Sequence, residues 1–150
     1  HYSLIENGYI SDTFPFYQTR YNHKTNKYEN TGTINVIESL LTILHLGEAG
    51  LQKQESIDFI KDQVSKGTLF NSYDLTGVPV DKNQSAAAYA LAAVVGAIIH
   101  DRELYDSSIL ILNNFQITDP SSLFYGGFGD IRTKDVFSYN NLMALIAYDL

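Results

Sequence analysis

The spacing of apolar residues along the chain predicts five helices. Apolar side chains recur every three or four residues, as they do on one face of a helix. The segments with this pattern are residues 34–46, 52–65, 83–99, 102–114 and 138–150. Gly67 follows the second segment, where a glycine ends a helix.

Start and stop signals frame the first helix. Thr33 or Asn35 can cap it, and Glu38 stands three residues after Asn35, as a capping box prefers. Gly47 and Gly50 are expected to break it.

The third segment predicts a helix that is buried on all sides. Residues 86–99 contain no charged side chain and only one tyrosine. This stretch is too short to cross a bilayer, and its flanks are charged, so no membrane span is expected. Its alanines and Gly96 would let neighbouring helices approach closely.

Residues 1–32 lack helical periodicity and predict extended chain with a turn. The polar run 22–27 separates two aromatic-rich stretches, which favours a small β-hairpin. The aromatic residues expected to flank this hairpin are Phe14, Phe16, Tyr21 and Tyr28. Residues 115–136 contain a glycine-rich stretch and are expected to form a loop.

The order of these segments predicts a mainly α fold. Short connections join the first helix to the second and the third to the fourth, as in antiparallel helical hairpins. Such pairs with long loops between them are typical of an α/α toroid, or of half of one. The length of 150 residues suits one domain.

Composition excludes several classes of function. The net charge of −7 and the lack of a Lys/Arg cluster disfavour binding to nucleic acid or to an anionic membrane surface. The chain has no cysteine, which excludes disulfides and thiolate chemistry, and its four histidines have no metal-site spacing. Eleven tyrosines suit sugar binding, although ordinary packing accounts for most such rings.

Asp74 is the main candidate for chemistry. It ends the β-prone run 68–73 and precedes Gly77, Pro79 and the buried helix. A carboxylate held in this way could act as a general base. The alternative is a turn or cap aspartate, and the residue pattern alone favours that alternative.

The residues around Asp74 resemble the catalytic-base signature of family 8 glycoside hydrolases. Tyr73-Asp74 and Val78-Pro79 match the signature, and a buried helix follows. Gly77 and Asp81 stand where the family has arginines. The segments 31–46 and 128–142 also resemble the family, so the likeness spans residues 31–150. It corresponds to the C-terminal half of the family's six-hairpin barrel.

The resemblance implies an (α/α)6 barrel and an endo-acting, inverting polysaccharide hydrolase. It implies that Asp74 is the general base and that Tyr73 and Tyr139 assist it or position substrate. The family's general acid lies in a Ser-Glu-Gly segment, which this chain lacks, so we expect it upstream. Residues 1–150 would then be one domain that completes its barrel with an N-terminal remainder. The resemblance also implies a secreted or surface-attached bacterial enzyme that needs no metal or other cofactor.

A second candidate region is the stretch 15–21, which interleaves rings with hydrogen-bonding groups. It predicts a polysaccharide groove that uses Tyr17, Arg20 and Tyr21, and an ordinary hairpin packed on one face is an equal alternative. Two other functions remain open: a catalytically inactive carbohydrate-binding or scaffold domain, and a helical interaction domain without a role in sugar binding. In the latter, Tyr73, Asp74 and Tyr139 would not converge.

Overall fold

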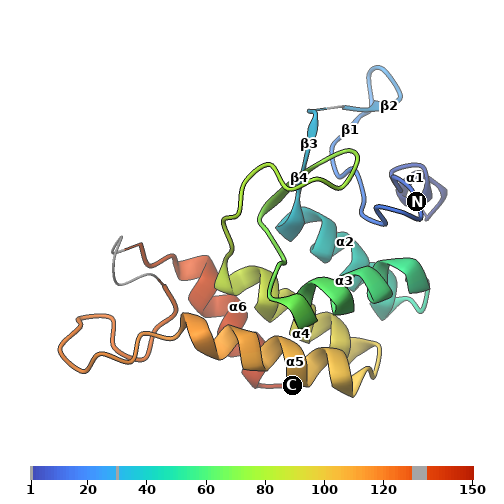
Figure 1. The fold of residues 1–150 in the computed structure, drawn as a ribbon. Helices are drawn as coiled ribbons and strands as arrows, with labels where there is room; N and C mark the ends of the chain where they lie inside the picture. The colour runs from blue at the N-terminus through green and yellow to red at the C-terminus, as the bar shows by residue number, and fades with distance from the viewer. Residues whose placement is uncertain (1, 30, 130–134) are drawn as a thin grey trace.

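The computed structural model describes residues 2–29, 31–129 and 135–150 of the chain (Figure 1). The helices are α1 (Tyr2–Glu6), α2 (Val36–Glu48), α3 (Gln54–Lys66), α4 (Ala86–Ile98), α5 (Arg102–Leu112) and α6 (Ser138–Tyr148), with a 3₁₀ turn at Asn113–Phe115. The strands are β1 (Tyr21–Asn22), β2 (Lys27–Tyr28), β3 (Thr33–Asn35) and β4 (Ser72–Asp74). The predicted mainly α fold class with a small β-hairpin is confirmed.

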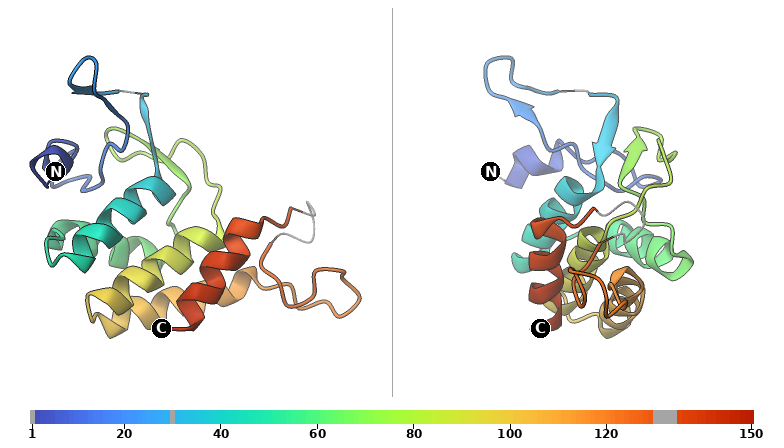
Figure 2. Two further views of the ribbon diagram at one scale, coloured as in Figure 1. Left: turned by 180° about the vertical axis from the view of Figure 1, so that it is seen from behind. Right: turned by 90° about the vertical axis from the view of Figure 1, so that its left-hand side faces the viewer.

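Helix α4 lies at the centre of the molecule and packs against α2, α5 and α6 (Figure 2). Every residue from Ala86 to Gly96 is buried, which confirms the predicted core helix. The small side chains let its neighbours approach: a Cβ at Gly96 would lie 2.7 Å from the backbone nitrogen of Tyr105 in α5. No helix in the described part of the chain is long and apolar enough to cross a membrane.

The signals at the ends of α2 and α3 are largely confirmed. The Asn35 side chain accepts a hydrogen bond from the backbone N–H of Glu38, and Gly67 ends α3 with a φ of 63°. The prediction for Gly47 was wrong, because this residue lies inside α2. A Cβ there would lie 3.0 Å from the Ile99 side chain, so this glycine allows a close contact. Gly50, with a φ of 67°, follows the helix.

The N-terminal region forms the predicted hairpin but uses its aromatic residues differently. Tyr21 and Tyr28 face each other across β1 and β2. Phe14 and Phe16 are fully buried instead, with rings 5.8 and 5.1 Å from Phe59 of α3. The expectation that residues 1–32 are wholly non-helical was also wrong, because residues 2–6 form α1.

Strands β3 and β4 form a short antiparallel pair, the β3–β4 ladder, on top of α2. Ile34 is opposite Tyr73, and both side chains are buried. Thr33 is opposite Asp74 on the other face. The Val36 backbone N–H at the start of α2 donates to the carbonyl of Asn71, which ties the segment before β4 to the helix.

Candidate functional site

Asp74 stands at the start of a tight turn. Its backbone N–H donates to the carbonyl of Val78 at 2.8 Å, and the chain runs back alongside β4. The carboxylate oxygen Oδ1 accepts three hydrogen bonds, from the Thr76 hydroxyl at 2.7 Å and from the N–H groups of Thr76 and Val78 at 2.8 and 3.0 Å. No described residue donates to Oδ2.

These hydrogen bonds favour the charged form of the carboxylate. The Thr76 hydroxyl and the Val78 N–H hold the pKa of Asp74 below its usual value. The group is therefore ionised at neutral pH, with one oxygen fixed by the turn. It can accept a proton through Oδ2.

Gly77 explains why an arginine is absent from the Asp74 turn. Its φ is 86°, a left-handed conformation that side chains rarely adopt, and an added Cβ would lie 2.9 Å from the Phe14 ring. The turn as built cannot accept the arginine that family 8 places here. Among the described residues, no lysine or arginine pairs with Asp74.

Tyr73 points into the core, away from the face that carries Asp74. Its side chain is 1% exposed and lies among Phe14, Phe16 and Phe59. Its hydroxyl donates to the carbonyl of Thr68 and accepts from the N–H of Phe70, both at 3.0 Å. The tyrosine thus fixes the strand that carries Asp74.

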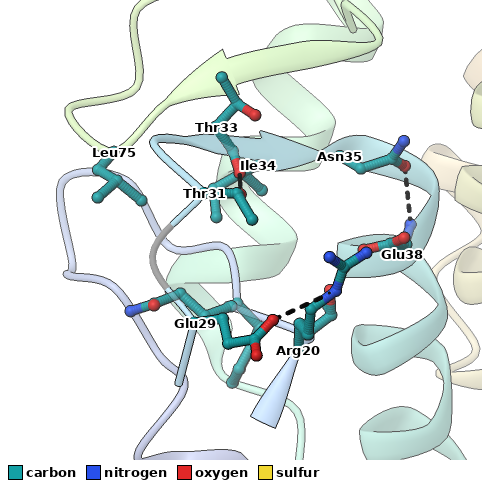
Figure 3. Close-up of a pocket in the computed structure, with 11 residues that line it drawn as sticks. Arg20, Glu29, Thr31, Thr33, Ile34, Asn35, Glu38 and Leu75 are labelled. Atoms are coloured by element: carbon teal, nitrogen blue, oxygen red, sulfur yellow. Dashed lines mark hydrogen bonds and ion pairs between the residues drawn. The ribbon is translucent and has the colours of Figure 1, made fainter. Parts of the chain in front are cut away.

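A small pocket adjoins the outer face of the β3–β4 ladder (Figure 3). This ladder pocket has a volume of about 160 Å³, and its walls include Tyr17, Arg20, Glu29, Thr33, Glu38 and Leu75. Directly opposed side chains of an antiparallel pair project from the same face. Asp74 therefore projects from the same face as Thr33. Leu75, the residue after Asp74, is part of the pocket wall.

Charged and polar groups surround the ladder pocket. Arg20 extends toward Glu29, at 3.9 Å between Nε and Oε2 (Figure 3). The Thr19 hydroxyl donates to Glu38 at 2.5 Å. Tyr17 also lines the pocket but is only 1% exposed, and burial raises its pKa to about 12.

The structure brings some of the predicted sugar-binding residues together and leaves others apart. Tyr17 and Arg20 share the ladder pocket. Tyr21 packs edge-on against Tyr28 in the hairpin, with ring centroids 5.2 Å apart. Tyr139 is 42% exposed on α6 and lines neither the ladder pocket nor the larger pocket described below.

The segment 128–142, which resembles family 8 in sequence, contains an asparagine that holds a loop in place. The Asn141 side chain accepts from the N–H of Phe128 at 2.9 Å and donates to its carbonyl at 3.0 Å. These bonds fix the loop to the start of α6. Asp130, which belongs to the same stretch, lies outside the described residues.

A second, larger pocket was not anticipated from the sequence. This amide pocket has a volume of about 830 Å³, and its lining residues include the starts of α4 and α6 and the segment that follows α5. Its side-chain amides are Asn71, Asn83, Gln84, Asn114, Gln116 and Asn140. They come from separate segments, and the only signal in the sequence is that amide residues gather near the ends of the predicted helices.

The segment 71–75, which contains β4, links the two pockets. Asn71 lines the amide pocket, and Leu75 lines the ladder pocket. Asp74 lies between them on β4. The described residues contain no cluster of three or more His, Asp or Glu side chains that could hold a metal ion.

Comparisons with known proteins show similarity to segments of larger proteins. A solved structure of a novel alpha-amylase from Clostridium perfringens superposes with a TM-score of 0.90 and 36% identity, over 98% of this chain and 45% of that one. The "Putative lipoprotein YdaJ" of Bacillus subtilis (strain 168) is 29% identical over an alignment 150 positions long, which covers 95% of this chain and 38% of the relative. No family model matches the chain.

A further structure shares the fold alone. PssZ from Listeria monocytogenes superposes with a TM-score of 0.65 and 15% identity, over 89% of this chain and 40% of that one. The chain thus spans less than half the length of each of these proteins. The match to the Clostridium structure confirms the predicted class of helical fold, part of an (α/α)6 barrel, and shows a glycosidase-like fold.

Proposed function

We propose that this chain is part of a glycoside hydrolase that cleaves a polysaccharide. The observation that carries the proposal is the TM-score of 0.90, at 36% identity, with a protein described as an alpha-amylase. The Asp74 turn supports it, because it holds an ionised carboxylate between Thr33, its partner across the ladder, and Leu75, which both line the ladder pocket; Asp74 itself is not one of the lining residues.

The proposed mechanism is an inverting displacement at the anomeric carbon. Asp74 Oδ2 takes a proton from the attacking water, while a general acid protonates the leaving oxygen. In inverting enzymes the two carboxyl groups are about 6.5–9.5 Å apart, which leaves room for the water. We place the general acid on a segment that precedes this chain, so that residues 1–150 complete the catalytic barrel from its C-terminal side.

The remaining assignments follow the same proposal. Tyr17 and Arg20 would contact sugar at the ladder pocket, with Tyr21 beyond them on the hairpin, and Tyr139 would contribute from α6. Tyr73 would act by holding β4 in place, since its hydroxyl is engaged by backbone groups. Family 8 is the proposed family, with Gly77 as its clearest departure. The name of the Bacillus protein supports attachment at the cell surface.

The test compares full-length protein with its Asp74→Asn and Asp81→Asn variants on a panel of α- and β-linked polysaccharides. Asp81 is the matched control, because it lies in the same loop and, among the described residues, its carboxylate accepts only from a backbone N–H, that of Asn83. Loss of a general base lowers turnover by about 10²–10⁴-fold. We expect this loss in reducing-sugar release for Asp74→Asn and normal release for Asp81→Asn. Equal activity in all three proteins would remove Asp74 as the base.

The second candidate function is a catalytically inactive carbohydrate-binding domain. It is favoured by the three hydrogen bonds that tie Asp74 into a turn and by the positive φ of Gly77, which keeps a cationic neighbour out. Glycan binding without hydrolysis by the full-length protein would establish it.

A further inference from the structure

We propose that Thr76 positions Asp74 as the general base, because its hydroxyl and its N–H fix Oδ1 and leave Oδ2 free for the attacking water. This inference rests on the proposed function and deepens it by naming the group that orients the base. Thr76 acts through Asp74, so it is a positioning residue and not a catalytic one.

A carboxylate that takes a proton from one bound water needs a fixed orientation. The last torsion of an aspartate side chain is broad, so the carboxylate has no sharp rotamer of its own. A displacement of about 1 Å in an active site can lower the rate about 100-fold. A base of this kind therefore needs partners that distinguish its two oxygens.

The hydrogen bonds of the turn make this distinction. Oδ1 of Asp74 accepts from the Thr76 hydroxyl at 2.7 Å and from the N–H groups of Thr76 and Val78 at 2.8 and 3.0 Å, whereas no described residue donates to Oδ2. Thr76 supplies two of the three bonds. Its hydroxyl is the one donor that a substitution can remove without changing the backbone.

The turn leaves this task to neutral donors. The positive φ of Gly77 and the nearby Phe14 ring exclude a long side chain at position 77. Among the described residues, no lysine or arginine pairs with Asp74. The Thr76 hydroxyl is the largest cause of the lowered pKa of Asp74, and the loss of a donor to the charged form raises a pKa.

The position of Thr76 allows its hydroxyl to be tested by itself. The side chain is exposed, so its removal leaves no cavity in the core. Valine keeps the β-branched shape and the backbone N–H but has no hydroxyl. Serine keeps the hydroxyl and loses only the methyl group.

A similar turn at residues 119–121 provides the matched control. The Ser121 hydroxyl and N–H donate to Oδ1 of Asp119 at 2.8 and 2.9 Å, and they lower the pKa of that carboxyl as well. Asp119 lines neither the ladder pocket nor the amide pocket. Ser121→Ala therefore removes the same kind of bond away from the proposed base.

The test measures reducing-sugar release by full-length protein from soluble starch, β-glucan, xylan and chitosan as a function of pH. We expect Thr76→Val to lower kcat about 10- to 100-fold. The acid limb of kcat/KM should move to higher pH, because this limb reports the pKa of the base in the free enzyme. Thr76→Ser should recover the wild-type profile, and Ser121→Ala should not change it. Thr76→Ala, which also lacks the hydroxyl, keeps the test valid if valine distorts the turn.

The outcomes separate this inference from the proposed function. An unchanged pH profile in Thr76→Val and Thr76→Ala would overturn the inference, and so would a loss of kcat in Thr76→Ser equal to that in Thr76→Val. Hydrolysis abolished by Asp74→Asn would then leave the proposed function standing. A lower kcat with an unmoved acid limb and a lower Tm would make Thr76 a structural turn residue only. Full activity of Asp74→Asn, or no hydrolysis by the wild type on the whole panel, would overturn both proposals.

Discussion

The inner and outer faces of the β3–β4 ladder differ in burial, polarity and hydrogen bonding. The inner face carries Ile34, 5% exposed, and Tyr73, 1% exposed, on the aromatic core. The outer face carries Thr33 and Asp74 beside a polar pocket. Because side chains alternate along a strand, neighbouring residues serve opposite faces. Stability is therefore concentrated in one residue and the proposed chemistry in the next, and each can be perturbed by itself.

The largest effect on stability is expected for Tyr73→Ala. Removing a large buried aromatic side chain leaves a cavity and costs about 3–5 kcal/mol in the free energy of unfolding. Denaturant titration measures this loss. The control is Thr33→Ala on the outer face, which should change stability by less than about 0.5 kcal/mol. Similar losses for both variants would show that the outer face contributes as much to the free energy of unfolding as the inner face.

A smaller loss is expected for Gly77→Arg. A left-handed conformation costs a side-chain-bearing residue about 1–2 kcal/mol, and overpacking against Phe14 adds about 1–3 kcal/mol. Gly77→Ala separates the backbone from the guanidinium, since alanine has the same φ and the same Cβ contact. A stable Gly77→Arg protein with higher activity would mean that the turn can adopt the backbone conformation that holds the arginine in family 8.

Tyr73→Phe tests the inner hydroxyl alone. The ring stays packed, but the Thr68 carbonyl and the Phe70 N–H lose their partner. Leaving buried polar groups unsatisfied costs about 1–3 kcal/mol. Thermal unfolding should show this loss, while kcat should be unchanged if the tyrosine only fixes β4. A fall in kcat at full stability would instead give its hydroxyl a role at the site.

The smallest effect is a pH dependence from the outer face. The folded pKa of Asp74 lies below the unfolded value, so its stabilisation of the turn is present above the unfolded pKa, near 3.9. It is lost as the pH falls through the folded pKa. Stability measured between pH 6 and pH 2 should therefore decline less steeply in Asp74→Asn than in the wild type. Parallel curves would show that the turn does not depend on the charge.

The sequence predicted elements whose signals lie within one segment. The buried helix α4 followed from its run of uncharged residues, and the ends of α2 and α3 followed from Asn35 and Gly67. Helix α1 was missed because five residues are too few to show a period. Phe14 and Phe16 were assigned to the hairpin because their partner Phe59 is distant in sequence.

The candidate site was only partly predictable for the same reason. Asp74 and its turn could be placed from local residues. The reason that a glycine stands at position 77 could not be predicted, because it depends on contact with Phe14, which is more than sixty residues earlier. The amide pocket depends on four segments that meet only in the folded chain, and its asparagines and glutamines resemble ordinary loop residues in the sequence.

The junction between β3 and α2 has a consequence for motion. Asn35 is both the last residue of the strand and the cap of the helix, so no flexible connection separates them. The Val36 N–H also donates to the Asn71 carbonyl, which couples the start of β4 to the same helix end. Local opening of a protein follows units that share hydrogen bonds. Amide hydrogens of the ladder should therefore exchange with solvent at the same rate as those in the first turn of α2. The position of Asp74 is thus coupled to a helix and not to a free loop.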